Sequence, residues 1–340
     1  MMKKVFLSLV VAMLANVNGI AQQIAVVKGS ATQVCQTLTE AIECAQEGSV
    51  IYLPGGGFSI ADSVKINKKL TIMGIGHKID SGNADGNTII GGNLHFEAGS
   101  DGSALIGCYV IGNVNVGNEK MPVNDFTMKW CNVNAVSVGN AQCENMIINQ
   151  NYVRSQSNFG GAPVKITNNV IYNIVNVTLG IIKNNIVVGG DQNGCAVIFI
   201  RNSTIMYNVV FSGYYLYDVR DCIISDNMKT SGHFGQNDIP VELDLLFVNN
   251  QGVNPNSDFH FTENYQEYSN IGIYGGTGFS DGAQPPVPFI SHKEIAEQTD
   301  AAGKLKIFIK VKASDGTMQG GAIGGSEQDQ PVNSGDEEGM

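Results

Sequence analysis

The 340-residue chain is poor in arginine and tryptophan, and after its first residues it has no long hydrophobic run. It contains one tryptophan, and its 20 basic residues against 31 acidic residues give a formal net charge of −11. Nucleic acids and anionic membrane surfaces bind clustered lysine and arginine, so this balance argues against both as partners. No later segment is apolar over the length that a spanning helix requires, so we expect no membrane span.

Metal, redox and phosphate motifs are also missing. None of the seven cysteines has a Cys-x-x-Cys spacing, and the five histidines show no metal-ligand spacing. The glycine-rich runs lack the Lys-Ser/Thr pair that completes a phosphate-binding loop. We therefore expect no metal and no cofactor.

The one hydrophobic run lies at the start of the chain. Lys3 and Lys4 precede an apolar stretch at 5–15, and the small residues Gly19 and Ala21 follow it. This order is typical of a secretory signal peptide, although a buried N-terminal strand is the alternative. We expect residues 1–21 to be removed on export, which places the protein in the periplasm, on the cell surface or outside the cell.

The most informative pattern is an Ile-x-x-Asn motif that recurs through the middle of the chain. Five copies begin at Ile148, Ile166, Ile182, Ile205 and Ile224, and the segments 105–108 and 128–131 fit with cysteine in place of asparagine. The asparagine or cysteine positions are 108, 131, 151, 169, 185, 208 and 227, which are 16 to 23 residues apart. Such a period indicates a solenoid, and the short β-branched runs around each motif indicate strands. The sequence therefore predicts an all-β parallel β-helix.

A row of stacked asparagines has a structural explanation. An amide at a bend donates to and accepts from its counterparts in neighbouring turns, and asparagine tolerates the left-handed backbone of a tight bend. Cys108 and Cys131 would then stack at a separation that suits a disulfide, although their parallel side-chain directions argue against one. The alternative is a column of small buried hydrophobic residues.

The region before the repeats predicts a cap and the first strands. Residues 37–40 form a capping box, and Leu38, Ala41, Ile42 and Ala45 fall on one helical face. Strands are expected at 49–53 and 69–74. This order, a helix followed by "GSVIYLPGGGF" and "KKLTIMGIGHKI", resembles the entry segment of pectin-lyase-like β-helix proteins, and the resemblance extends over about residues 24–288. It implies a right-handed parallel β-helix and suggests a polysaccharide lyase or glycoside hydrolase.

The catalytic motifs of such enzymes are not found. The chain has no adjacent Asp pair, no Arg-x-Lys and no Gly-His-Gly turn, and its acids show no spacing that predicts a catalytic pair. Fold by itself does not confer activity.

The region after the repeats predicts a second unit. Residues 284–288 are a proline-rich linker, and residues 304–312 alternate apolar residues with lysine, which predicts a strand. This strand is expected to dock on the solenoid or to pair with another chain. The predicted domains are thus the β-helix with its N-terminal cap at 22–288, a C-terminal strand segment at 289–312 and a disordered acidic tail at 313–340.

The best candidate for a binding site lies in the last repeats. Arg201 and Arg220 each precede a motif isoleucine by four residues, so they are expected to stack as neighbours, with Asp218 beside them. Tyr215 and Tyr217 lie just before. Arginine, carboxylate and tyrosine together suit a saccharide-binding surface, whereas the alternative is an ion-pair ladder that offsets repulsion between the stacked cations.

These observations favour an exported, non-catalytic β-helix protein that presents a rigid surface to a polysaccharide or a cell-surface glycan. Short connections between most turns support this hypothesis, with 155–162 and 189–194 among the longer ones. The alternative is a polysaccharide lyase or glycoside hydrolase that acts on acidic polysaccharide, through the arginine cluster or the less regular stretch at 112–123.

Overall fold

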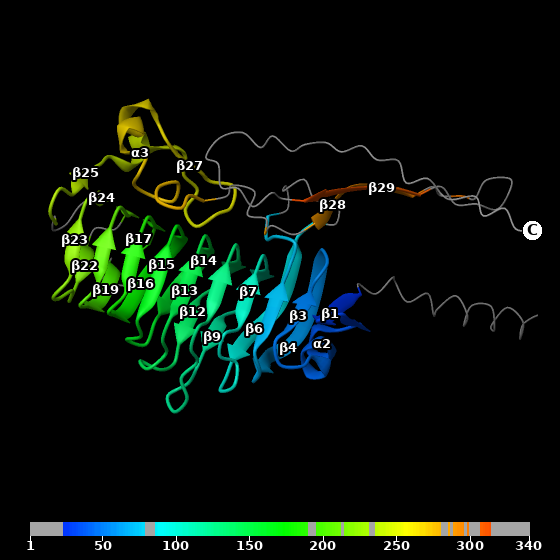
Figure 1. The fold of residues 1–340 in the computed structure, drawn as a ribbon. Helices are drawn as coiled ribbons and strands as arrows, with labels where there is room; N and C mark the ends of the chain where they lie inside the picture. Colours follow the sequence, from blue (N-terminus) through cyan, green and yellow to red (C-terminus); the bar gives the residue numbers. More distant parts are fainter. Residues whose placement is uncertain are drawn as a thin grey trace, which may run out of the picture.

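The protein is a parallel β-solenoid of about eight turns. The computed structural model describes residues 23–78, 86–189, 195–211, 214–230, 235–279, 285, 288–295, 298 and 307–313. Figure 1 shows the turns stacked along one axis, in chain order from the blue N-terminal end to the green turns. Parallel pairing of each turn with the next confirms the predicted fold class.

One face of the solenoid is an eleven-stranded sheet in the order β2-β1-β3-β5-β7-β10-β13-β15-β17-β20-β23. Only the first two pairings, β1 with β2 and β1 with β3, are antiparallel. The strands are β1 Ile24–Lys28, β2 Ala31–Cys35, β3 Ser49–Tyr52, β5 Leu70–Met73, β7 Ala104–Ile106, β10 Thr127–Lys129, β13 Met146–Asn149, β15 Val164–Thr167, β17 Ile181–Lys183, β20 Thr204–Met206 and β23 Ile223–Ser225.

The other faces belong to a fourteen-stranded sheet, because long strands such as β6, β14 and β16 bend from one face to the next. Its strands are β4 Gly56–Ile66, β6 Thr88–Phe96, β8 Tyr109–Val110, β9 Val114–Val116, β11 Asn132–Val133, β12 Val136–Val138, β14 Tyr152–Asn158, β16 Val170–Thr178, β18 Ile186–Val187, β19 Cys195–Arg201, β21 Val209–Val210, β22 Tyr214–Tyr217, β24 Met228–Lys229 and β25 Ile239–Pro240. Residues 155–158, predicted as part of a linker, thus belong to β14, and residues 156–158 pair with β16.

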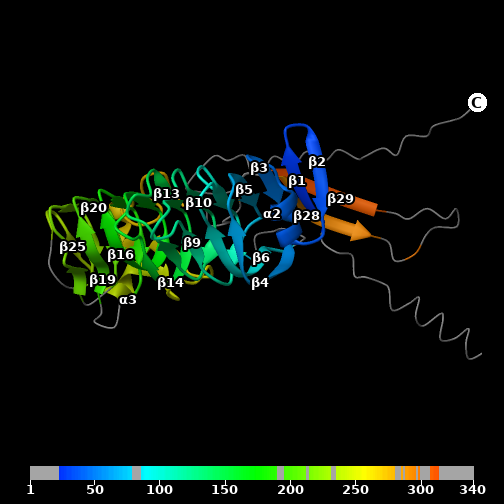
Figure 2. The same ribbon diagram turned by 90° about the horizontal axis from the view of Figure 1, so that it is seen from below.

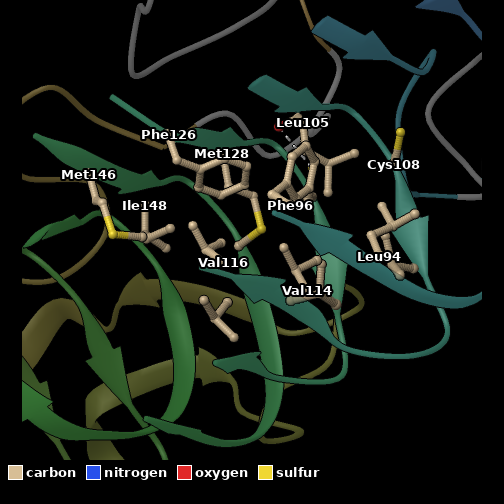
Figure 3. Packing of buried hydrophobic residues seen from close by; sticks show 14 of the residues in the cluster. Leu94, Phe96, Leu105, Cys108, Val114, Val116, Phe126, Met128, Met146 and Ile148 are labelled. Carbon is tan, nitrogen blue, oxygen red and sulfur yellow. Dashed lines mark hydrogen bonds between the residues drawn. The ribbon is translucent and has the colours of Figure 1, made fainter. Parts of the chain in front are cut away.

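The motif isoleucines line the interior in one row. Leu105 pairs with Met128, Met128 with Ile148 and Ile148 with Ile166, and the register continues to Ile224. Figure 3 shows Leu105, Met128 and Ile148 pointing into the core together with Phe96 and Phe126, whose rings lie 4.6 Å apart. Full burial of one such side chain contributes about 1.5–3 kcal/mol.

The asparagine ladder, formed by Asn151, Asn169, Asn185, Asn208 and Asn227, runs beside this row. Each Oδ1 accepts the backbone N–H of the motif residue in the preceding turn, as in Asn169 N to Asn185 Oδ1 at 3.0 Å, and from Asn169 on it also accepts that residue's Nδ2. Each Nδ2 also donates to the carbonyl two residues earlier. The predicted row of stacked amides is therefore confirmed.

The left-handed residue of each bend is the one before the ladder position. Gly107, Trp130, Gln150, Asn168, Asn184, Tyr207, Asp226 and Asn237 all have φ between 53° and 64°. The prediction that the ladder asparagine itself adopts this backbone was wrong, because its side chain must point inward to reach the next turn.

Cys108 and Cys131 occupy the same row, and neither forms a disulfide. Each thiol donates to the carbonyl two residues earlier, Ile106 O at 3.3 Å and Lys129 O at 3.2 Å. A cysteine therefore replaces one donor of the asparagine amide and provides a small buried side chain, as the alternative interpretation proposed.

The N-terminal end is covered by α2, Leu38–Cys44, as predicted. Thr37 Oγ1 accepts Glu40 N at 3.1 Å, and the helix buries Leu38, Ala41 and Ile42. At its other end Lys68 Nζ donates to three backbone carbonyls, at 2.9–3.2 Å. A cation at this position also stabilises the negative end of the helix dipole.

A C-terminal segment packs on the outside of the later turns, which the sequence did not predict. It contains α3 Leu243–Leu246, β26 Phe247–Asn249, β27 Asp258–Phe261 and the 3₁₀ helix η1 Glu263–Tyr268. Its apolar side chains form a second core with the outward residues of the solenoid strands, among them Val170, Ile186 and Val209. Figure 1 shows this segment, in yellow, beside the turns that carry β15 and β17.

The predicted C-terminal strand is present as β29, Ile307–Ala313, and residues 304–306 lie outside the described residues. It pairs antiparallel with β28, Pro288–Ile295, which begins at the end of the predicted linker. Its hydrogen-bonded partner is thus the preceding strand of the chain instead of the solenoid. Figure 2 places this hairpin at the N-terminal end of the molecule, near β1 and β2.

Candidate functional site

A narrow outer facet carries the predicted site residues. In three successive turns the chain bends twice within four residues, at positive φ, so that two residues form a short facet between the bends. The bend residues are Asn176 and Leu179, Phe199 and Asn202, and Asp218 and Asp221. Between them Val177 and Ile200 point inward and are buried. The outward positions are therefore Thr178, Arg201 and Arg220.

Arg201 and Arg220 are direct neighbours, as predicted, because they form a parallel bridge between successive turns. Asp218 lies between the two side chains: one carboxylate oxygen accepts Arg201 Nη2 at 2.6 Å and the other accepts Arg220 Nε at 2.7 Å. Arg201 also donates to the carbonyls of Ile200 and Asp218. This arrangement offsets the repulsion between the cations and leaves the Arg220 side chain 68% exposed.

The two arginines also determine the ionisation of Asp218. The hydrogen bond from Arg201 is the largest influence and lowers the pKa of the Asp218 carboxyl, partial burial opposes it, and Arg220 lowers the pKa further. A carboxyl group with a lowered pKa stays ionised at neutral pH and is a poor proton donor.

Two aromatic rings lie beside the arginines. Phe199 and Tyr217 contact each other edge to face, with centroids 5.8 Å apart, and they are 43% and 55% exposed. Phe199 was not predicted, and its left-handed backbone in a strand is the feature that turns it outward. Tyr215 lies in β22, but its side chain is outside the described part of the chain. We call Phe199, Arg201, Tyr217, Asp218 and Arg220 the aromatic–arginine patch.

Apolar residues border this patch. Leu179 is 67% exposed and directly precedes the outer face of β17, where Ile181 is 42% exposed. Ile223, 63% exposed, lies two turns along the same row as Ile181. Large exposed apolar side chains grouped with polar ones are typical of contact surfaces.

The stretch at 112–123 forms a protruding turn. Asn118 and Met121 pair their backbone N–H and C=O groups at 3.0–3.1 Å, and Val116 and Val123 on either side are buried. The residues at the tip, Glu119, Lys120 and Met121, are exposed. This geometry does not bring catalytic side chains together.

A hollow of about 230 Å³ lies in the C-terminal segment. It is lined mainly by apolar and aromatic side chains, including Phe259, Ile271 and Tyr274. The His260 ring stacks on Tyr274 with centroids 4.0 Å apart and contacts Asp258 at 2.7 Å. Partial burial opposes ionisation of Asp258, but hydrogen bonds from His260 outweigh it and lower the pKa of the carboxyl. Residues two apart in a strand lie on the same face, so the spacing of Asp258 and His260 is the signal in the sequence that could have predicted this pair.

Comparison with known proteins gives no relative: no family model, no curated protein and no solved structure matches the chain. Among the described residues no group of three or more His, Cys, Asp or Glu side chains is placed to hold a metal ion. Within the same residues no helix has the length and apolarity to cross a membrane.

Proposed function

We propose that the protein is an exported, non-catalytic binding protein of the cell envelope, and that the aromatic–arginine patch binds an acidic polysaccharide. The observation that carries this proposal is the exposed Phe199–Tyr217 pair beside the exposed Arg220. The order of helix and strands at the N-terminal end supports a relationship with pectin-lyase-like β-helix proteins, in which polysaccharides are the usual partners.

The chemistry of the patch suits a uronic acid or a sulfated sugar. Aromatic rings present flat apolar faces to the C–H groups of a sugar ring, and guanidinium groups bind carboxylates and sulfates through paired hydrogen bonds. In a chain of net charge −11, the exposed guanidinium of Arg220 is the cation of the patch that an anionic glycan would contact.

The rigidity of the patch also supports binding. Its residues lie on β19 and β22 and on the bends that follow them, and the backbones of Ile200, Arg201 and Arg220 are joined by hydrogen bonds between turns. Rings held on such a scaffold lose little conformational freedom when a ligand binds, so more of the contact energy appears as affinity.

A lyase or hydrolase at the same patch is the second candidate, and the arginines favour it because they would bind the substrate carboxylate. The state of Asp218 argues against it. Both carboxylate oxygens already accept from arginines and the pKa of the group is lowered, so Asp218 is not available as a general acid.

The test is a glycan array with the purified protein, run beside assays for unsaturated and reducing-end products. We expect Tyr217→Ala and Phe199→Ala each to weaken binding about 3- to 10-fold, as loss of one aromatic contact implies. Tyr52→Ala is the matched control, because Tyr52 is 41% exposed on β3 at the other end of the solenoid.

Arg220→Ala separates the two candidates. Binding that weakens without any product formation in the native protein supports the binding protein. Turnover in the native protein that disappears in Arg220→Ala establishes the enzyme instead. Binding that is unchanged in all three patch variants excludes the patch as the site.

A further inference from the structure

Two cysteine thiols meet at the N-terminal cap of the solenoid. The Sγ atoms of Cys35 and Cys44 are 3.1 Å apart. Cys35 is the last residue of β2, and Cys44 is the last residue of α2. Sulfur atoms in a disulfide are about 2.05 Å apart, so a side-chain movement of about 1 Å would bring these two within bonding distance.

Independent contacts hold the two backbones in place. Cys35 lies opposite Ile24 in the β1–β2 pairing, and the connection to the helix is fixed by Gln36 N, which donates to Glu40 Oε2 at 2.9 Å. At the end of the helix Lys68 Nζ donates to the carbonyls on both sides of Cys44. These contacts hold both backbones while the two Sγ atoms touch, so the pair is preorganised for a bond.

Other cysteines are engaged differently. Cys108, Cys131 and Cys222 each donate to the carbonyl two residues earlier, and Cys143 Sγ accepts Val123 N at 3.3 Å. These contacts are with the backbone. Cys44 Sγ also lies 3.5 Å from Ala41 O, but its shorter contact is with Cys35 Sγ.

We propose that Cys35 and Cys44 form a disulfide bond that fixes the N-terminal cap when the protein meets a disulfide oxidant, either a small-molecule disulfide or a protein that exchanges disulfides. The Cys44 thiolate attacks the oxidant, forms a mixed disulfide and releases one thiol. The Cys35 thiolate then attacks the Cys44 sulfur and releases the second thiol. Two cysteine thiols are oxidised and one oxidant disulfide is reduced to two thiols, which take up the two cysteine protons.

The order of attack follows from exposure. Cys44 is half-buried and accessible, whereas Cys35 is fully buried, and that burial raises the pKa of the Cys35 thiol to about 12. The thiolate is the nucleophile, so Cys35 reacts only after the oxidant is held on Cys44 beside it.

The bond would join the edge strand β2 to the helix that covers the end of the core. It closes a short loop, and such a closure restricts the unfolded chain. We expect the oxidised protein to unfold at a higher denaturant concentration than the reduced protein, with the difference confined to the cap.

The test starts from the fully reduced, full-length protein in a buffer of oxidised and reduced glutathione. Thiols are counted in denaturant after quenching, and the protein is digested without reduction by a protease that cleaves after glutamate. Cleavage after Glu40 separates Cys35 from Cys44, so only a disulfide keeps their fragments together. We expect two thiols to be lost, the two fragments to stay linked and the denaturation midpoint to rise.

Cys35→Ala/Cys44→Ser is the matched variant, and the wild-type measurements do not depend on its folding. It should lose no thiols in the same buffer and show no rise in midpoint. Full retention of all seven thiols in the native protein overturns the proposal. So does linkage of Cys35 or Cys44 to any other cysteine, or a mixed disulfide with glutathione that persists on Cys44.

Discussion

Replacing Asn185 with alanine tests whether the asparagine ladder stabilises the solenoid. Asn185 Oδ1 accepts the N–H and the Nδ2 of Asn169, both at 3.0 Å, and its own Nδ2 donates to Ile166 O, Lys183 O and Asn208 Oδ1 at 2.9–3.0 Å. Asn185 is fully buried. Alanine removes all of these bonds and leaves the Asn169 N–H without its acceptor.

The expected loss follows from the number of bonds. A buried N–H without a partner costs about 1–3 kcal/mol, and each further hydrogen bond lost costs about 1 kcal/mol. The Asn185 Nδ2 has only two hydrogens, so its three contacts count as two bonds, and the Asn169 Nδ2 bond makes three further bonds lost. We therefore expect Asn185→Ala to lower the free energy of unfolding by about 4–6 kcal/mol, measured by urea denaturation followed by circular dichroism. The matched control is Asn256→Ala, whose side chain is exposed in a loop and should change stability by less than about 0.5 kcal/mol.

Asn185→Asp tests whether the ladder requires a hydrogen-bond donor at the Nδ2 position. The second carboxylate oxygen would face three oxygen acceptors where Nδ2 now donates, so we expect this variant to be at least as unstable as Asn185→Ala at pH 7. If both variants unfold within about 1 kcal/mol of the wild type, the amide row contributes little, and stacking of the apolar interior would have to explain the stability.

Three further predictions concern the ends of the solenoid. Asp238 terminates the ladder: one carboxylate oxygen accepts Asn227 N and Nδ2, and the other accepts Gly235 N and faces Lys229 Nζ at 3.8 Å. Asp238→Asn would place an amide donor against these donors, so we expect it to lower the urea denaturation midpoint. A midpoint equal to that of the wild type would contradict this account. Burial lowers the pKa of Lys229 to about 8, although Asp238 opposes the shift. Between pH 8 and about 10.5 the unfolded chain therefore binds more protons than the native state, so stability relative to Lys229→Met should rise by about 1–3 kcal/mol across that window. A constant difference between these two proteins at pH 7.5 and 10 would show that Lys229 is not perturbed. Lys68→Met should cost about 1 kcal/mol in urea denaturation through loss of the α2 C-terminal contacts, whereas Lys65→Met, at an exposed ion pair, should cost less.

The turn-to-turn register was predictable from the sequence. The positions from 108 to 227 lie in one row, and the isoleucines three residues before lie in another, because each turn pairs with the next one about twenty residues later. The neighbouring positions of Arg201 and Arg220 followed from the same register. A contact that is repeated in every turn requires the same residue type at a regular spacing, and such a spacing can be recognised in the sequence.

Features that occur once were not predictable. Asp238 ends the ladder only eleven residues after Asn227, so it breaks the period, and Phe199 joins Tyr217 only because its backbone is left-handed. Residues 155–158 were likewise assigned to a linker, because they are polar although they form the end of a strand that bends around a corner.

The sequence by itself determined the parallel solenoid, the inward row of aliphatic side chains and the amide ladder, since all three arise from pairing between adjacent turns. Only the tertiary structure decided what covers the outer face, where Asn168 Nδ2 donates to Ile273 O and Asn184 Nδ2 donates to Asn270 O. These contacts join residues 105 and 86 positions apart and occur once each. Their energy depends on the three-dimensional fit of two surfaces, and such a fit leaves no repeating pattern along the chain.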